Sequence, residues 1–251
     1  MKMLLSTLII LFSTCLAFSQ QLDIKYHKAV SDFITSVKSN QSQTIANKIK
    51  FPLKREYPLP SIKDRNDFIK RYKELFDDQL LILITKSDVK TDWSAMGWRG
   101  IMLPNGSVWL DYDGKLIAIN YQTNAEKLKR IKLINADKLI LYISLRQFKN
   151  PILQMRTNKF KVRIDELANG SYRYASWPLK EVMSSKPSLI IHNGKYIPEG
   201  SGGNYSFKFL SGNYRYECNI NAIGEEDAPD AGLTIYKDGK EILSQSASML
   251  K

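Results

Sequence analysis

The change from helix to sheet is encoded in the stretch Trp98-Arg99-Gly100-Ile101-Met102-Leu103-Pro104-Asn105-Gly106-Ser107-Val108-Trp109-Leu110-Asp111-Tyr112-Asp113-Gly114. Its apolar residues recur with period two, which is typical of half-buried strands. Pro104-Asn105-Gly106 and Asp113-Gly114 are sequences that favour the tight turns of β-hairpins. The pattern predicts three antiparallel strands at residues 98–103, 107–112 and 115–121.

Upstream of this stretch the apolar residues follow a helical period. In residues 23–38 they recur at spacings of three and four, which predicts an amphipathic helix. A short second helix is expected at residues 42–50, and Asp64 is placed to cap a third. Helices followed by a run of strands predict an α+β unit over residues 20–125, with the helices packed on a curved antiparallel sheet.

Downstream the chain has the pattern of an all-β protein. Strands are expected at residues 138–145, 159–165, 171–177, 188–192, 205–210, 214–219, 233–236 and 241–243. Asn193-Gly194, Ser211-Gly212-Asn213 and Asp238-Gly239 are turn sequences between them. We therefore expect residues 126–251 to form an all-β sandwich or small barrel with a basic lead-in segment. The acidic residues 224–230 favour a mobile loop.

The first nineteen residues have the order of a secretory signal peptide. Lys2 precedes the apolar run Leu4–Phe12, and the small residues Ala17 and Ser19 stand just before Gln20. The run is shorter than the ~20 residues of a membrane span. Cys15 raises the alternative of a lipid anchor, which we consider less favoured because Thr14 stands where Gly or Ala is usual. The sequence predicts an exported protein, periplasmic or secreted, with no transmembrane span in the mature chain.

The net charge of +12 is concentrated in the middle of the chain. Residues 127–163 contain eleven Lys or Arg but a single acid, Asp137. The candidate surface residues of this basic band are Lys127, Lys129, Arg130, Lys132, Lys159, Lys161 and Arg163. Such a band favours an acidic partner, and for an exported protein we expect an anionic envelope component or another envelope protein rather than nucleic acid. The alternative is a surface that only keeps the protein soluble.

Two strings in the first half resemble a known group of proteins. They are Ile45-Ala46-Asn47-Lys48-Ile49-Lys50-Phe51-Pro52-Leu53 and the hairpin sequence Gly97–Leu110, with the helix of Phe68 between them. Together they resemble exported bacterial proteins of the nuclear-transport-factor-two-like, or cystatin-like, cone fold. The resemblance implies a cone-shaped α+β domain with a pocket, as found in isomerases, dehydratases and non-catalytic binding proteins. Enzymes of that group use a His–Asp or Tyr–Asp pair, but this region has no histidine after His27.

A cluster of aromatic and charged residues flanks the first hairpin and is the candidate ligand site. It comprises Asp92, Trp93, Trp98, Arg99, Trp109 and Asp111. Indoles can form the apolar walls of a pocket, arginine can bind an anion with its planar fork, and a desolvated aspartate can act as a general base. The alternative is that the tryptophans belong to the core and the charged side chains face solvent at the hairpin edges.

Several chemistries have little support in the sequence. His27 and His192 are the only histidines, and without paired Cys/His spacing no zinc site is expected. Cys218 is the one cysteine after Gln20, so a disulfide within the mature chain is excluded. The glycines of residues 200–204 lack the Lys-Ser/Thr ending of a phosphate loop. No catalytic residue, metal or cofactor is therefore assigned.

These observations favour a non-catalytic exported protein that binds an anionic ligand or a protein surface. The alternative is a small pocket enzyme of isomerase or hydrolase type. Such an enzyme would use Asp92 or Asp111 as general base and Arg99 to hold an anion.

Overall fold

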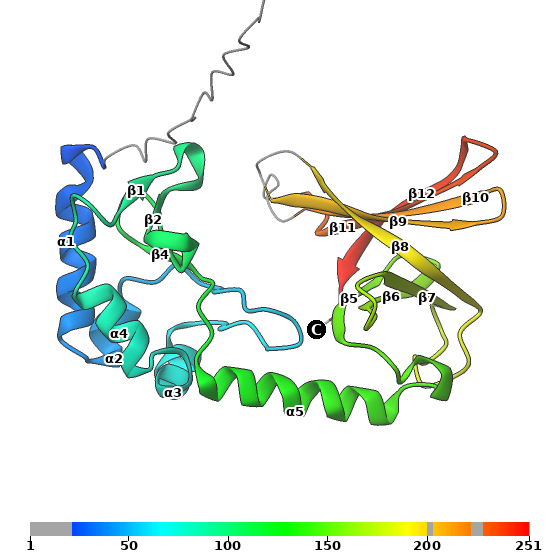
Figure 1. The fold of residues 1–251 in the computed structure, drawn as a ribbon, viewed down its shortest axis with the longest axis horizontal. Helices are drawn as coiled ribbons and strands as arrows, with labels where there is room; N and C mark the ends of the chain where they lie inside the picture. Colours follow the sequence, from blue (N-terminus) through cyan, green and yellow to red (C-terminus); the bar gives the residue numbers. More distant parts are fainter. Residues whose placement is uncertain (1–21, 200–202, 222–227, 251) are drawn as a thin grey trace, which may run out of the picture.

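The computed structural model describes residues 22–199, 203–221 and 228–250 as an α+β fold with two sheets, one of them a closed barrel (Figure 1). The predicted signal peptide and Cys15 lie outside these residues, as do Gly200–Gly202 and the acidic residues 224–227. Among the described residues, no helix is both long enough and apolar enough to cross a membrane.

Four helices precede the first sheet. They are α1 (Ile24–Lys38), α2 (Ser42–Ala46), α3 (Arg65–Leu75) and α4 (Asp78–Thr85). The first and third predicted helices are confirmed, and Asp64 caps α3 by accepting a hydrogen bond from the Asp67 backbone N–H over 2.9 Å. The second helix ends at Ala46, four residues before the predicted end. Helix α4 is not predicted from the sequence, because a continuous apolar run hides the helical period.

The first sheet is antiparallel, with its four short strands in the order of the chain: β1 (Ser94–Ala95), β2 (Ile101–Met102), β3 (Val108–Leu110) and β4 (Leu116–Ile119). The predicted strand start at Trp98 is wrong, because Gly97–Arg99 form a 3-10 turn, η1. A second 3-10 turn, η2 (Pro104–Gly106), joins β2 to β3. Gly100 has a φ of 100°, and a Cβ there would collide with the Leu110 carbonyl oxygen, so the close strands require glycine. One core joins the helices to this sheet.

The first part of the basic band is helical. Helix α5 (Asn124–Ile140) begins after Thr123, whose hydroxyl accepts a hydrogen bond from the Glu126 backbone N–H over 3.1 Å. The strand predicted at residues 138–145 is wrong: α5 runs through its first residues and the 3-10 turn η3 (Ile143–Leu145) follows. The predicted domain boundary between residues 125 and 126 falls in the first turn of α5, and the division into two domains stays a prediction.

Eight antiparallel strands close the barrel, so of the two predicted β architectures it is the barrel that forms. They are β5 (Asn150–Arg156), β6 (Phe160–Glu166), β7 (Tyr172–Pro178), β8 (Leu189–Glu199), β9 (Asn204–Ser211), β10 (Tyr214–Ile220), β11 (Ala231–Lys237) and β12 (Lys240–Met249). Strand β5 was not predicted. The barrel closes at a short ladder, in which β12 pairs with β5 only at Ser248–Arg156 and Met249–Met155. The Leu250 backbone N–H extends this seam to the Gln154 carbonyl over 2.8 Å.

The turn predicted at Asn193-Gly194 is wrong, because β8 continues through it. Its first half pairs with β7 and its second half with β9. Asn193 has a φ of 59°, and the pairing with β7 shifts register opposite this point, as in a β-bulge. A Cβ on Gly194 would collide with the Phe209 ring, so the bend brings the backbone against the barrel core. Asn193-Gly194 is a dipeptide that favours a hairpin turn, but in this structure it produces a bend within one strand.

Candidate functional site

The structure does not gather the three predicted tryptophans around one pocket. Trp93 is buried in the first core, where its ring packs edge-on against Phe33 at 6.2 Å between centroids and its Nε1 donates to Ser87 Oγ over 2.9 Å. Trp98 lies in the η1 turn and is 61% exposed. These two indoles therefore face different surroundings.

Arg99 and Trp109 are brought together. The Arg99 guanidinium carbon lies 5.7 Å from the centre of the Trp109 ring, a cation–π contact between the η1 turn and β3. Trp109 is half-buried, and its Nε1 donates to the Gly106 carbonyl over 3.0 Å. The contact holds the Arg99 guanidinium against the face of the Trp109 ring. Binding of an anion by Arg99 stays a prediction.

The two aspartates of the cluster stabilise turns. Asp92 Oδ2 accepts a hydrogen bond from the Asp88 backbone N–H over 2.7 Å. Asp111 Oδ1 accepts from the backbone N–H groups of Asp113 and Lys115, over 3.1 and 2.8 Å, and so closes the Asp113-Gly114 hairpin turn. Each carboxylate has a local structural role that the sequence analysis did not assign.

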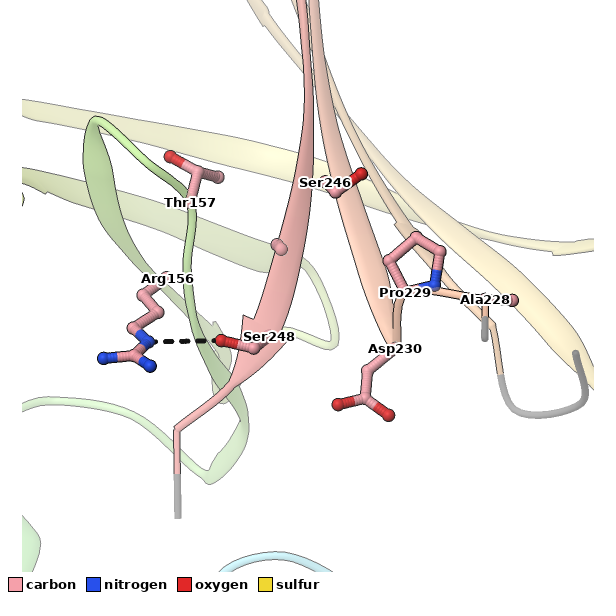
Figure 2. A pocket seen from close by; sticks show the side chains of 8 residues that line it. Arg156, Thr157, Ala228, Pro229, Asp230, Ser246 and Ser248 are labelled. Carbon is pink, nitrogen blue, oxygen red and sulfur yellow. Dashed lines mark hydrogen bonds between the residues drawn. The ribbon is translucent and has the colours of Figure 1, made fainter. Parts of the chain in front are cut away.

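Two cavities are formed by other residues. One, of about 470 Å³, opens at the β5–β12 seam and is lined by Arg156, Thr157, Ala228, Pro229, Asp230, Ser246, Ala247 and Ser248. Arg156 Nε donates to Ser248 Oγ over 3.2 Å, and the Asp230 carboxylate points toward the same open side (Figure 2). The other, of about 540 Å³, lies between residues 60–71 and Lys129. Neither is lined by a residue of the predicted tryptophan cluster.

Arg163 does not belong to the exposed basic surface, and that prediction is wrong. Its side chain is fully buried and forms ion pairs with Asp137 at 2.6 Å and Asp165 at 2.7 Å. Its guanidinium also lies 4.9 Å from the Phe148 ring centre. Strand alternation turns Arg163 away from the barrel core, but the C-terminal half of α5 and the segment after it cover that outer face. A buried guanidinium requires a counter-charge, and Asp137 and Asp165 supply it to Arg163.

Three further basic residues are engaged in bonds within the protein. Lys129 Nζ pairs with Glu74 at 2.7 Å, and Lys161 Nζ donates to the Glu181 carbonyl over 2.7 Å. Arg130 pairs with Glu56 at 2.8 Å and donates to the Tyr57 carbonyl over 3.2 Å and to Asn150 Oδ1 over 3.1 Å. Arg130 thus ties the 54–60 segment, α5 and the first barrel strand to one another.

Lys127 and Lys132 remain on the exposed side of α5, and five large apolar side chains in the helix or just after it are also exposed. Leu128 is 62% exposed, Ile131 54%, Leu139 74%, Ile140 68% and Ile143, just past the helix, 72%. Five of them lie on one side of the helix, and we call these five the α5 face: Lys127, Leu128, Ile131, Lys132 and Leu139. Ile140, nine residues after Ile131, lies on the opposite side of the helix, and Ile143 lies beyond its end. Lys159 is exposed as predicted, on the turn between β5 and β6.

The apolar residues of this segment carry a helical signal that its charges do not. Leu128, Ile131 and Leu139 share one side of a helix, being three and eight residues apart. The apolar run at residues 138–145 hides this signal, because it also fits the pattern of a strand.

The described residues contain no group of three His, Cys, Asp or Glu side chains placed to hold a metal ion. Comparison with known proteins found no match: no family model, no curated protein and no solved structure resembles the chain closely enough to be reported. The resemblance of the first half to the cone fold therefore stays a prediction.

Proposed function

We propose that the protein is an exported, non-catalytic interaction protein that binds an anionic partner through the α5 face. The observation that carries the proposal is the separation of charge across this helix. Both carboxylates of α5 point inward, Glu126 to buried Arg55 and Asp137 to buried Arg163. Lys127 and Lys132 point outward and are exposed, and no ion pair is formed by either with a described residue. The outer side of α5 is therefore cationic.

Exposed lysines that are not paired attract an anionic partner over distances of about a Debye length, ~8–10 Å in physiological salt. They also raise the rate of encounter with such a partner. In contrast, Lys129, Arg130 and Arg163 are already neutralised by carboxylates of the protein itself. Of the candidate lysines, Lys127, Lys132 and Lys159 are exposed and form no ion pair with a described residue, and two of these three lie on the α5 face.

The helix is held at both ends, so the α5 face is presented in one orientation. At its start, Arg55 binds Glu126 and the carbonyl groups of Ile119 and Tyr121. Near its end, Asp137 binds Arg163 of the barrel strand β6. A surface fixed before binding loses little conformational entropy when it is occupied, which favours a role in recognition.

The pocket-enzyme alternative has less support. It needs Asp92 or Asp111 as a general base beside Arg99, whereas both carboxylates already accept hydrogen bonds that stabilise turns. Arg99 is engaged with the Trp109 ring. The two cavities are formed by other residues. No observation favours catalysis at this cluster over a structural role.

The test of the proposed function is binding of the purified protein to dextran sulfate beads at increasing salt. We expect binding that weakens steeply with salt and is lost in the double variant Lys127→Glu/Lys132→Glu. The matched control is Lys195→Glu/Lys240→Glu, which makes the same change of charge at two exposed barrel lysines. Equal loss in both double variants would show that only net charge matters, and the proposal would then be wrong.

A further inference from the structure

We infer that the anionic partner of the α5 face is the surface of a lipid bilayer, into which the apolar side chains of that face insert. The inference rests on the proposed function and specifies its ligand. A purely ionic partner, such as a polymer, would use only Lys127 and Lys132. It would leave the three exposed apolar side chains of the face, Leu128, Ile131 and Leu139, in contact with water.

The apolar side chains of the α5 face lie close together in the chain. Leu128, Ile131 and Leu139 are each more than half exposed, and they fall within twelve consecutive residues, 128–139. Isolated exposed apolar residues are normal on any protein, but contiguous ones mark interaction sites. Asn135, four residues after Ile131 and four before Leu139, lies between these two side chains on the same side of the helix. The face thus combines apolar side chains with lysines.

This combination is what an interfacial helix presents to a membrane. Such a helix lies flat, buries Leu or Ile about 5–10 Å into the boundary between headgroups and acyl chains, and keeps lysines at the phosphate level. The 17 residues of α5 extend over about 25 Å. In Figure 1 the helix runs along one edge of the molecule, with the first sheet and the barrel on the same side of it. A planar surface can therefore approach the whole length of α5.

The charge of the face decides against a second copy of this chain as its occupant. Two α5 faces in contact would bring Lys127 and Lys132 of both copies together, and neither carboxylate of α5 is available to compensate them. An anionic bilayer supplies both negatively charged headgroups for the lysines and an apolar interior for the Leu and Ile side chains. Each lysine close to such a surface contributes about fivefold to affinity, and the inserted side chains contribute in proportion to the area they bury.

The first experiment measures co-sedimentation of the purified protein with vesicles of phosphatidylcholine alone or mixed with phosphatidylglycerol. We expect binding to the anionic vesicles, weakened by salt. The variant Leu128→Ser/Leu139→Ser should lower vesicle affinity at least tenfold yet still bind dextran sulfate. The matched control is Val182→Ser/Leu210→Ser, which removes two exposed apolar side chains elsewhere, 59% and 70% exposed. All four side chains lie on the surface, and circular dichroism checks that each variant is folded.

The second experiment reports depth of insertion. An environment-sensitive fluorophore is attached to Leu139→Cys in a Cys15→Ser background, in which the buried Cys218 is shielded from labelling. The same fluorophore on Leu210→Cys, in β9, is the control. A blue shift with anionic vesicles is expected at position 139 and not at position 210.

The outcomes separate the two proposals. Binding to dextran sulfate that depends on Lys127 and Lys132, without vesicle binding, leaves the proposed function in place and overturns the membrane inference. Vesicle binding that is unchanged in Leu128→Ser/Leu139→Ser, with no blue shift at position 139, overturns it too, since the lipid then acts only as a polyanion. Self-association that is abolished by the same variant would assign the face to a second copy instead. If the lysine variants alter neither kind of binding, both proposals fail.

Discussion

Arg55 and Glu126 form an ion pair that is almost completely shielded from water, although 71 residues separate them in the chain. Arg55 Nε donates to Glu126 Oε1 over 2.7 Å, and the same guanidinium reaches the carbonyl groups of Ile119 and Tyr121. A carboxylate in the first turn of α5 also interacts favourably with the helix dipole. This pair fixes where α5 leaves the first sheet, and therefore which side of the helix is exposed.

The first prediction concerns this pair. Glu126→Gln keeps the shape of the side chain but leaves the Arg55 charge buried without a counter-charge. Breaking a buried pair in this way costs about 3–5 kcal/mol of stability. Urea unfolding of the variant should show a loss of this order, whereas Glu241→Gln, at an exposed position of β12, should change the free energy of unfolding by less than about 0.5 kcal/mol. A loss as small as that of the control would mean that the pair does not hold α5.

The other end of the helix gives a second prediction. In Arg163→Met, Asp137 loses its buried partner, and Asp165 keeps only Arg173, at 2.7 Å. We expect a loss of about 3–5 kcal/mol in the free energy of unfolding, because Asp137, whose side chain is only 15% exposed, is left without its counter-charge. The matched change Lys159→Met removes an exposed cation just before the same strand and should be nearly neutral. Comparable losses in the two variants would contradict the burial of Arg163.

A third prediction tests the bend in β8. Gly194→Ala places a methyl group against the Phe209 ring, which is itself buried in the barrel core. Overpacking of this kind costs about 1–3 kcal/mol. Gly232→Ala in β11 is the control, since its Cβ would lie 3.6 Å from its nearest neighbour, the Gln245 carbonyl oxygen. Adding Phe209→Leu to Gly194→Ala should recover part of the stability. No recovery would show that the alanine acts through the backbone rather than through the ring.

The dipeptide Asn193-Gly194 shows why part of this fold could not be predicted from the sequence. Asn193-Gly194 and Asp113-Gly114 have similar local preferences, yet the second closes a hairpin and the first bends one long strand. The difference is tertiary: closure of the barrel forces β8 to change partners at Gly194. Local patterns did predict α1, α3 and most barrel strands, because their side-chain period is set by one buried face.

The candidate site shows the same limit. The charge of the basic band could be counted from the sequence, but which of its cations remain available to a partner could not. Arg163 and Lys132 each add one positive charge to the basic band. In the structure, however, Arg163 is covered by α5, whereas Lys132 is exposed. The distinction depends on long-range contacts, chiefly that between Asp137 and Arg163. In the same way, the pairing of Asp111 with backbone N–H groups depends on turn geometry that composition does not reveal.

The last prediction concerns pH and the junction between the 54–60 segment and the barrel. Burial raises the pKa of Tyr57 to about 12; the nearby Arg163 charge lowers it, while Asp137 and Asp165 add to the increase. An unfolded tyrosine has a pKa near 10. Below about pH 10 both states keep the proton, and the stabilising contribution of Tyr57 is complete. Between about pH 10 and 12 the unfolded state releases its proton first, so the free energy of unfolding falls as pH rises and this contribution is lost by about pH 12.

Tyr57→Phe cannot ionise, so its free energy of unfolding should fall less steeply above about pH 10, by up to about 1.4 kcal/mol per pH unit. Urea unfolding of both proteins at neutral pH first measures the packing cost of losing the hydroxyl, and the alkaline series then isolates the titration. Other buried tyrosines titrate in both proteins and cancel in the difference. Parallel curves for the two proteins would mean that Tyr57 is open to solvent, and that the 54–60 segment is not held against Arg163 and its two aspartates.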